Sequence, residues 1–453
     1  MADNFTVIYY SGMSPEKLAE KVISISYGEM LMPPIPIDPF KLMRKFGIIY
    51  QFMEFRDLEG IYIVPEDEND IPIVGINYTR KITRQRFTAA HELCHHLKDR
   101  KSETCPIGGK SELERYAEMF AAELLMPRHL FRSVTSEYVK DGKVTLDDAL
   151  QIAERFGVSF RSCVLRLAYT FKLLDGEYGN LNKRIEQYKP DNRKRKLGID
   201  IENIELLKQA IDSYPFFFKV KENIVWYRFK NEFIYNENRM EGLNLDEDEV
   251  AEIITDLRMN GQDSDYCKED YDDIIQVVGH SDMYDYVLAT NDKLTIYKLL
   301  NLNRMLFQYA PFPEAAGKTR TENNLVLGTK FETVDWKDVT NELIKLQTPV
   351  EELIQSAAIL PTSDYIEGAV IIHHRITQIH PFRDGNGRCS RAMLNWMLRI
   401  KGLPPFYFKV SEKMRYYEAL ELADSKNEYK ELIRVVIREL FRTIIRMNNG
   451  GSK

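Results

Sequence analysis

The chain has 453 residues, of which 44% are hydrophobic and 29% are charged, and its formal net charge is -7. This length exceeds what one hydrophobic core normally holds, so we expect two or three domains of an ordinary soluble kind. The acidic balance offers no positive field to phosphate backbones, which argues against general nucleic-acid binding.

Signals for a membrane or for secretion are not evident in the sequence. No apolar run reaches the length of a membrane span, and Met1 to Asn4 do not lead from a basic region into an apolar stretch. The five cysteines are odd in number and form no CxxC pair: Cys94, Cys105, Cys163, Cys267 and Cys389. Free thiols in a reducing compartment explain this pattern most simply, so we expect a cytoplasmic protein without a membrane partner.

The first part of the chain combines helical periodicity with a strand. Residues 71–79 alternate and are rich in β-branched side chains, which predicts a strand. Helices are expected over residues 40–46, 87–97, 113–126 and 146–156. Gly157 ends the last of these helices, and Ser159 is placed to cap the next one.

A polar segment separates this region from the rest of the chain. Between residues 175 and 200 the apolar pattern fades, while Lys189 and residues 193–196 add basic charge. A solvated linker fits this composition better than a basic binding patch. We therefore expect domains over residues 1–172 and 201–448, joined by a linker over 173–200. Beyond the linker apolar residues recur at helical spacing, so the fold is expected to be mostly α.

The sequence HELCH, residues 91–95, lies within an expected helix. Four residues span a little over one helical turn, so His91 and His95 project from the same face, as two zinc ligands do. The adjacent Glu92 is then placed to act as a catalytic base toward a metal-bound water. The alternative is an exposed helix with chance histidines.

A catalytic zinc site needs a third protein ligand. The following helix and its approach carry four candidates: Glu112, Glu114, Glu118 and Glu123. In helical projection Glu114 lies nearest the apolar stripe, whereas Glu112 and Glu123 point to the far side. A core-facing carboxylate is costly unless it is paired or bound to metal, so Glu114 is the predicted third ligand.

The segments VGINYTRKITRQRFTAAHELCHHL and ELERYAEMFAAELLMP resemble the ImmA/IrrE family of zinc metallopeptidases. The resemblance covers roughly residues 20–170 and implies an α+β zincin-like fold of the gluzincin type, with a small sheet and a C-terminal helical pair. It assigns zinc to His91, His95 and Glu114, in agreement with the projection. Cys94 stands where the family usually has glycine, and a redox-sensitive contact there stays open. Some such domains are sensors that cleave nothing, so a protein substrate also stays open.

Two neighbouring features are interpreted as structural. His96 leaves the helix about a third of a turn from His95, so we expect it at the surface or behind a ligand. The segment LDDALQIAERFGVSFRSCVLRLAYT has the outline of a helix-turn-helix, yet its second helix carries only Arg161 and Arg166 as basic residues. We expect packing within the domain there, rather than DNA readout.

Residues 380–391 read HPFRDGNGRCSR and combine the residue types that phosphate chemistry needs. Gly385 and Gly387 flank Asn386, which opens backbone conformations closed to residues with a Cβ. A helix pattern begins near Arg388. Backbone amides at such a turn and helix start form an anion nest suited to phosphates.

Charged side chains complete this loop. Arg388 and Arg391 are three residues apart on one helix face and are placed to grip β- and γ-phosphates. Asp384 is placed to hold Mg²⁺ against the same phosphates, and His380 to take a proton from an attacking hydroxyl. A glycine turn with ordinary surface charges would explain GNG alone, but not the full set at this spacing.

The full set matches HxFx(D/E)GNGRxxR, the signature of the Fic family, at every defined position. The resemblance spans roughly residues 205–445 and implies an all-α Fic fold with a β-hairpin flap. It implies an enzyme that moves AMP from Mg-ATP to a Ser, Thr or Tyr hydroxyl of a target protein. By this resemblance His380 is the base, Phe382 anchors the loop, Asp384 holds the metal, and the phosphates are bound by Gly385, Asn386, Gly387, Arg388 and Arg391.

Two further features fit this family. Residues 317–328 resemble the Fic flap, a hairpin that pins the target segment by strand addition, and the alternative is a plain surface hairpin. His373, on the preceding helix, matches a family histidine for which we expect a structural role.

The segment NRMEG, residues 238–242, resembles the inhibitory helix of Fic proteins, usually written (S/T)xxxE(G/N). By this resemblance Glu241 pairs with Arg391 and blocks the γ-phosphate, and a charge-assisted pair of this kind is geometrically reasonable. Glu237 stands at the Ser/Thr position, which departs from the pattern. The alternative is an ordinary exposed glutamate. In some Fic enzymes this glutamate also supports removal of AMP, so the reaction direction stays open.

We therefore expect a protein adenylyltransferase, autoinhibited through Glu241, on one chain with a zinc metallopeptidase-like domain. Mg²⁺ with ATP and Zn²⁺ are the expected cofactors. The alternatives are a zinc peptidase that cleaves a repressor or partner, with the Fic-like domain as regulator; a Fic enzyme that removes AMP; and a non-catalytic sensor. The families suggest a bacterial role in stress, toxin–antitoxin pairs or phage defence, which no residue identifies.

Overall fold

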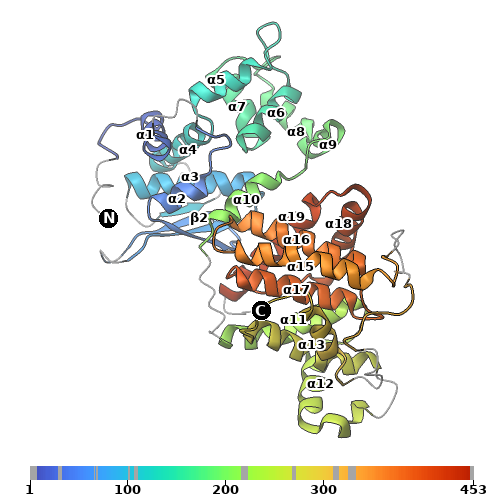
Figure 1. The fold of residues 1–453 in the computed structure, drawn as a ribbon. Coiled ribbons are helices and arrows are strands. Elements are labelled where there is room, and N and C mark those ends of the chain that lie inside the picture. The colour runs from blue at the N-terminus through green and yellow to red at the C-terminus, as the bar shows by residue number, and fades with distance from the viewer. Residues whose placement is uncertain are drawn as a thin grey trace. The chain divides into compact units, whose positions relative to one another are not determined.

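The computed structural model describes residues 8–28, 33–65, 67, 70–99, 103–106, 111–215, 223–267, 272–309, 316–324 and 333–448. The chain divides into two compact units, Met1–Pro215 and Phe216–Lys453 (Figure 1). Helices dominate both units, as expected. Within the described ranges, no helix is both long enough and apolar enough to cross a bilayer.

The first unit contains a small mixed sheet and most of its residues are helical. In chain order its described elements are α1 (Pro15–Tyr27), α2 (Pro39–Lys45), β1 (Ile49–Met53), β2 (Leu58–Ile63), β3 (Ile73–Asn77), α3 (Ile82–Lys98), β4 (Glu103–Pro106), α4 (Glu112–Leu125), α5 (Arg128–Ser136), α6 (Leu146–Phe156), α7 (Phe160–Leu165), the π-helix η1 (Arg166–Thr170), α8 (Leu181–Tyr188), α9 (Pro190–Leu197) and α10 (Ile204–Ser213).

The strand order in the sheet is β1-β3-β2-β4. β1 runs parallel to β3, with Ile49 opposite Ile73, whereas β2 runs antiparallel to both β3 and β4. The predicted strand over 71–79 is therefore present as β3. Helix α3 packs on β2 and β3, and α4 packs on α3 and α1, so α3 lies between the sheet and a second helical layer.

Local sequence signals explain where these helices begin and end. Thr145 and Asp148 form a capping box at the start of α6, and Gly157 closes that helix in a left-handed conformation. Ser159 accepts a hydrogen bond from the backbone N–H of Ser162 and so caps α7, as expected. The bounds of α6 agree with the sequence-based range.

The segment expected to be a linker, 173–200, differs from that description. It contains α8 and α9, and the first unit continues through α10 to Pro215. The basic residues of α9 are tied to acids of α6: Arg193 Nε donates to Asp147 at 2.8 Å, and Lys194 pairs with Glu154 at 2.5 Å. These helices are held partly by ion pairs, so their apolar periodicity is weak.

The second unit is helical throughout its described residues, 223–267, 272–309, 316–324 and 333–448. Its elements are α11 (Asn223–Glu241), α12 (Glu247–Asn260), the 3-10 turns η2 (Gly261–Asp263) and η3 (Asp265–Cys267), α13 (Asp272–Ala289), α14 (Lys298–Leu306), α15 (Val339–Gln355), α16 (Thr362–Ile379), α17 (Asn386–Ile400), the 3-10 turn η5 (Val410–Glu412), α18 (Lys413–Lys426) and α19 (Lys430–Asn448).

Helix α17 lies at the centre of this unit, because α13, α14 and α16 all pack on it. The loop that joins α16 to α17 therefore starts and ends on core helices. Of the expected flap, residues 317–324 are described without a strand, and 325–328 lie outside the described residues.

Candidate functional sites

His91 and His95 on α3 meet Glu114 on α4 in the interior of the first unit. The Nε2 atoms of the two histidines are 3.1 Å apart. Glu114 places its two oxygens 3.2 Å from Nε2 of His91 and 3.5 Å from Nε2 of His95. Two imidazole nitrogens and a carboxylate thus converge on one point, as the sequence predicted.

This donor set fits a single zinc ion. Zinc binds nitrogen and oxygen at about 2.0–2.1 Å, so neighbouring ligand atoms of a tetrahedral site lie about 3.3 Å apart. The three measured separations bracket that value. Among the described residues, two histidines and one glutamate supply three ligand atoms, a set that is typical of catalytic zinc sites.

Local contacts position Glu114 and His95. Ser111 caps α4 by accepting from the backbone N–H of Glu114 at 3.1 Å, which holds Glu114 in the first helical turn, where a negative charge is favoured. His95 is oriented from behind, since its Nδ1 lies 2.8 Å from Oδ2 of Asp99. Carboxylates of this kind fix the tautomer of a metal-binding histidine.

Electrostatics in the triad follow these contacts. Hydrogen bonds to His91 and His95 lower the pKa of Glu114 to about 2. Burial opposes a charge on His95, but its hydrogen bonds to Asp99 and Glu114 raise its pKa to about 9. The triad therefore holds a proton that an arriving cation must displace.

Glu92 is buried beside the triad, on the side of α3 that faces β2. A Cβ on Gly60 of β2 would lie 2.9 Å from Oε1 of Glu92 and 2.5 Å from Cγ2 of Thr88. The strand can pass this close only because residue 60 has no side chain. Gly60 and Asp99 are thus parts of the site that the sequence reading missed.

The other residues considered from the sequence are not part of this triad. Glu112 and Glu118 are exposed, and Glu123 forms an ion pair with Arg166 at 2.7 Å. Nδ1 of His96 lies 3.0 Å from the Tyr62 hydroxyl, away from the three ligand atoms.

Cys94 is fully buried, and burial raises the pKa of its thiol well above the ordinary value. A buried, protonated thiol is unreactive, so the structure gives no support to a redox-sensitive contact.

The expected helix-turn-helix corresponds to α6, α7 and η1. Its two basic residues are engaged within the unit: Arg161 donates to Asn182 at 3.0 Å, and Arg166 is buried against Glu123. These contacts support the structural interpretation.

In the second unit His380 is the first residue after α16 and has a left-handed backbone, with φ of 49°. Such a conformation is uncommon for a residue with a side chain and needs support from its surroundings. Arg320 supplies it: Nε donates to the oxygen of His380 at 2.8 Å, and its backbone N–H donates to the oxygen of Pro381 at 2.8 Å. Burial, followed by the charge of Arg320, lowers the pKa of His380.

Asn386 shapes the loop that follows. Its side chain accepts from the backbone N–H of Phe382 at 2.8 Å and donates to the oxygen of Phe382 at 2.9 Å. These bonds fold the loop onto itself, and the assignment of Asn386 to phosphate binding stays a prediction. Phe382 is buried, as expected for an anchor in the core.

Gly385 is required by both its backbone and its neighbours. Its φ of 78° is left-handed, and a Cβ there would lie 2.7 Å from Leu306 and 2.8 Å from Phe307. Asn303 of α14 donates to the oxygen of Asp384 at 3.0 Å and accepts from the N–H of Gly317 at 2.8 Å. Asn303 therefore ties the loop to the start of the expected flap, a role that no motif indicated.

Arg388 lies in the first turn of α17 and is only 3% exposed. Its Nε and Nη1 atoms are buried without a hydrogen-bond partner among the described residues, and Nη2 lies 3.7 Å from Oδ2 of Asp384. A buried guanidinium with open donors beside a helix N-terminus is suited to an anion such as phosphate. Asp384 is largely exposed, which leaves its carboxylate accessible to a cation.

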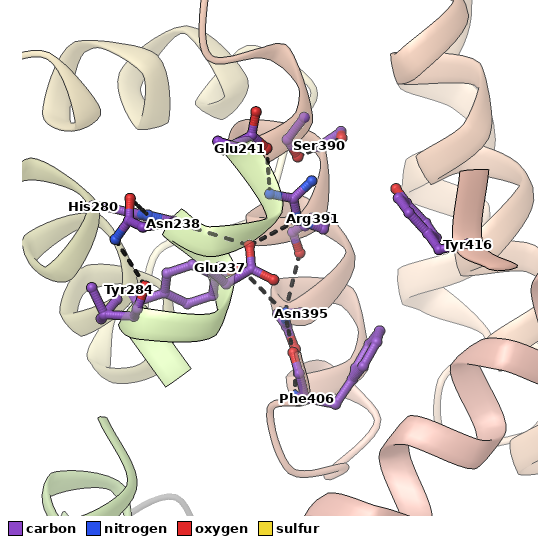
Figure 2. Close-up of polar contacts among 12 residues, drawn as sticks. Glu237, Asn238, Glu241, His280, Tyr284, Ser390, Arg391, Asn395, Phe406 and Tyr416 are labelled. Atoms are coloured by element: carbon purple, nitrogen blue, oxygen red, sulfur yellow. Dashed lines mark hydrogen bonds and ion pairs between the residues drawn. The ribbon is translucent and has the colours of Figure 1, made fainter. Parts of the chain in front are cut away.

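Arg391, one turn further along α17, lies between two glutamates of α11 (Figure 2). Its Nε donates to Oε2 of Glu237 at 2.7 Å, and its Nη2 donates to Oε1 of Glu241 at 2.7 Å. The pair between Glu241 and Arg391 agrees with the expected inhibitory contact. The contact with Glu237 was not expected.

The Glu241 carboxylate also reaches the loop itself. A Cβ on Gly387 would lie 3.0 Å from Oε1 of Glu241. Burial opposes the charge of Glu241, but Arg391 and Arg388 outweigh it and lower its pKa. An ionised carboxylate therefore lies at the start of α17, where an anion nest is expected.

His373 is buried and its Nε2 lies 2.8 Å from the hydroxyl of Tyr416. Its contacts are with the core of the unit, in line with the structural role expected for it.

Comparisons with known proteins assign both regions. Residues 52–168 match the family model described as the IrrE N-terminal-like domain, and residues 293–398 match that of the Fic/DOC family. The first unit therefore contains an IrrE N-terminal-like domain, and the second a Fic/DOC domain.

Curated relatives of the chain are protein adenylyltransferases. One from Caenorhabditis elegans, fic-1, is 30% identical over 175 residues, which is 36% of this chain and 33% of the relative. Another from Nematostella vectensis is 39% identical over 79 residues, which is 17% of this chain and 18% of the relative. The chain thus matches a third or less of the length of these two relatives.

Solved structures with similarity include Fic-1 residues 134–508 from C. elegans, at 18% identity and a TM-score of 0.44, covering 81% of this chain and 98% of that one. A Fic-domain signalling protein from Bacteroides thetaiotaomicron is 22% identical with a TM-score of 0.44, covering 55% of this chain and 96% of that one.

Proposed function

We propose that the second unit is a protein adenylyltransferase that uses Mg-ATP. The observation that carries this proposal is Arg388, whose buried guanidinium has Nε and Nη1 without partners among the described residues. A buried cation with open donors is costly unless an anion binds there. The curated relatives are named protein adenylyltransferases, which supports a nucleotide as this anion and an adenylylated protein as the product.

In this proposal the side chains of the loop have separate roles in the reaction. His380 takes the proton from a Ser, Thr or Tyr hydroxyl of a target protein, whose oxygen then attacks the α-phosphorus of ATP. The bond between the α-phosphorus and the bridging oxygen to the β-phosphate breaks, and pyrophosphate leaves. Arg388, Arg391 and the amides at the start of α17 stabilise the phosphate charge. Asp384 would hold the Mg²⁺ that accompanies ATP.

We also propose that Glu241 inhibits this reaction. Its carboxylate bonds Arg391 at 2.7 Å and lies against Gly387, so it occupies space and donors that a γ-phosphate needs. Two like charges will not share this position, since Arg391 has one set of terminal donors. ATP must then bind in an unproductive pose until Glu241 withdraws. A role of Glu241 in AMP removal is the alternative that the same geometry allows.

Label transfer tests the transferase. Purified wild type, Glu241→Gly and the double variant Glu241→Gly/His380→Ala are incubated with Mg²⁺, α-labelled ATP and cell lysate. The proposal expects label on the enzyme or on a lysate protein with Glu241→Gly, weak label with wild type and none with the double variant. Equal labelling by the single and double variants would exclude His380 as the base.

A second activity is favoured by the triad of the first unit. His91, His95 and Glu114 are suited to hold zinc, and such an ion, when bound, acidifies a water for hydrolysis. Glu92 is buried beside them, as a general base of a peptidase would be. We infer a zinc-dependent peptidase, with a protein substrate, as the candidate function of this unit. Loss of the cellular activity with Glu92→Ala, but not with His380→Ala, would make the peptidase the principal function.

A further inference from the structure

We propose that Glu237 is a positioning residue for the phosphate-binding Arg391, and not a second inhibitory glutamate. This inference rests on the proposed function of the second unit. It concerns a position where the chain departs from the inhibitory pattern described above, since Glu237 replaces Ser or Thr.

The two glutamates bind different parts of the same guanidinium. Glu237 accepts from Nε, at the base of the group, whereas Glu241 accepts from Nη2 at its end. Nη1 of Arg391 points the same way as Glu241, because it lies 3.0 Å from the position of a Cβ on Gly387. When Glu241 withdraws, both terminal nitrogens are left at the loop, while Nε remains bound.

The two glutamates also differ in how readily they can move. The side chain of Glu237 is 1% exposed, and that of Glu241 is 27% exposed. Glu241 is the last residue of α11 and precedes Gly242, so opening one helical turn is enough to release it. Glu237 lies one turn inside the helix, against the buried side chains of His280 and Tyr284 (Figure 2). Its release would leave a charge in the core without a partner.

The surroundings of Glu237 fit a permanent partner of Arg391. Nε2 of His280 lies 4.0 Å from Oε2 of Glu237, and burial lowers the pKa of His280 well below its ordinary value. His280 is therefore neutral. Burial raises the pKa of Glu237 above its ordinary value and Glu241 adds to this shift, while the hydrogen bond and charge of Arg391 and the charge of Arg388 oppose it. The neighbouring Asn238 bonds Nδ1 of His280 at 3.2 Å, which holds this part of α11 in place.

Removing Glu237 would leave Nε of Arg391 without its acceptor and free the side chain to rotate away from the loop. The expected loss is that of a charge-assisted hydrogen bond at the phosphates, roughly 10-fold in affinity. ATP would be affected and AMP would not, because AMP lacks the β- and γ-phosphates. An inhibitory glutamate would show the opposite sign, since its removal would strengthen ATP binding.

The test uses the full chain with Glu241→Gly as background. Glu237→Ala and Glu237→Gln are added to it, and KM and kcat for Mg-ATP are measured together with ATP and AMP affinities by calorimetry. We expect Glu237→Ala to raise KM and weaken ATP about 10-fold while AMP affinity is unchanged. Glu237→Gln should recover most of the ATP affinity, because its amide oxygen still accepts from Nε.

Tighter ATP binding or faster transfer with Glu237→Ala would overturn the proposal, and so would equal losses for ATP and AMP. Glu232→Ala is the matched control, because Glu232 lies on the same helix but bonds Tyr407 instead of Arg391. If Glu237→Ala does not fold, Glu237→Asp shortens the reach by one methylene and should weaken ATP in the same way. Affinities do not require transfer, so a selective loss of ATP binding supports the role of Glu237 even if no AMP is transferred.

Discussion

The side chain of Arg320 donates from Nε to the backbone oxygen of His380 at 2.8 Å. The same guanidinium bonds the oxygen of Val334 and, from Nη1, the oxygen of Glu322 at 2.9 Å. Its Nη2 also bonds the oxygen of Ile379 at 3.4 Å. One buried arginine thus joins four backbone positions, and one of them is the left-handed residue proposed as the catalytic base. Arg320 therefore holds the backbone of His380, whose imidazole also bonds the backbone of Thr377.

We predict that Arg320→Ala lowers the transfer rate of the Glu241→Gly enzyme about 10- to 100-fold, because a base displaced by about 1 Å loses its alignment. ATP affinity should stay within about twofold, since Arg320 does not contact the loop residues that bind phosphate. Lys345→Ala, at an exposed position, is the surface control. A loss of ATP affinity equal to the loss of rate would contradict a role through His380.

The acid limb of the pH–rate profile should lie at low pH. Burial and the charge of Arg320 lower the pKa of His380 below its ordinary value of 6.5, so the neutral form needed for a base persists below neutral pH. We expect kcat/KM to be constant from about pH 8 to about 6.5 and to fall only at lower pH. Arg320→Ala should move this limb upward. A limb above pH 7 in the parent enzyme would rule out this environment for the base.

Zinc binding to the first unit should depend on Asp99. This carboxylate lies 2.8 Å from Nδ1 of His95 and has no direct place among the three ligand atoms. We predict one zinc per chain, and a 10- to 100-fold weaker affinity, roughly, with Asp99→Asn. His91→Ala should abolish binding and Glu92→Gln should preserve it, as measured by competition with a chromogenic chelator. Undiminished affinity in His91→Ala would show that the triad is not the site.

Removal of zinc by a chelator should also lower the thermal stability of the chain, because a ligand that binds only the folded state stabilises it. Wild type should lose this increment on chelation, whereas His91→Ala should show the same melting temperature with and without chelator. A chelator effect of equal size in both proteins would point to metal elsewhere.

A buried ion pair gives a matched test of stability in the first unit. Glu123 bonds both Arg166, whose side chain is 5% exposed, and Arg128, which is 50% exposed. Arg166→Ala leaves a largely buried carboxylate without its buried partner and should lower the free energy of unfolding by about 3–5 kcal/mol. Arg128→Ala removes only the exposed partner and should lower it by less than about 1 kcal/mol. Urea unfolding, monitored through the release of zinc, measures both losses of stability. Equal effects would show that Glu123 is solvated in solution.

The convergence of His91, His95 and Glu114 was predictable from helix geometry. Four residues separate His91 from His95, which places both on one face, and Glu114 lies beside the apolar stripe of its helix. Gly60 and Asp99 were not predictable in this way. Gly60 matters because a strand passes close to Glu92, and such an approach depends on how the sheet packs on α3.

The helices within residues 173–200 could not be predicted, for a different reason. The composition of 173–200 is polar, and helices whose contacts include ion pairs show weak hydrophobic periodicity. Arg193 and Lys194 bind acids of α6 that lie tens of residues earlier in the chain. Only the folded structure brings these charges together.

The loop over residues 380–391 could be recognised from its motif, but the residues that contact this loop could not. Glu237 stood out in the sequence only as a departure from a pattern, and its bond to Arg391 joins residues 154 positions apart. Asn303 and Arg320 also act across long separations, and both bond backbone atoms, which leave no mark in a motif.

We propose above that Glu241 restrains an enzyme that transfers AMP. The most direct measurement is the fate of label when the Glu241→Gly chain is incubated with Mg-ATP labelled either at the α- or at the γ-phosphate. We predict that protein retains the α-label and not the γ-label, with an intact-mass increase of one adenylyl group, and that wild type gives far less of both signals. Retention of γ-label, or equal α-labelling of wild type and Glu241→Gly, would contradict it.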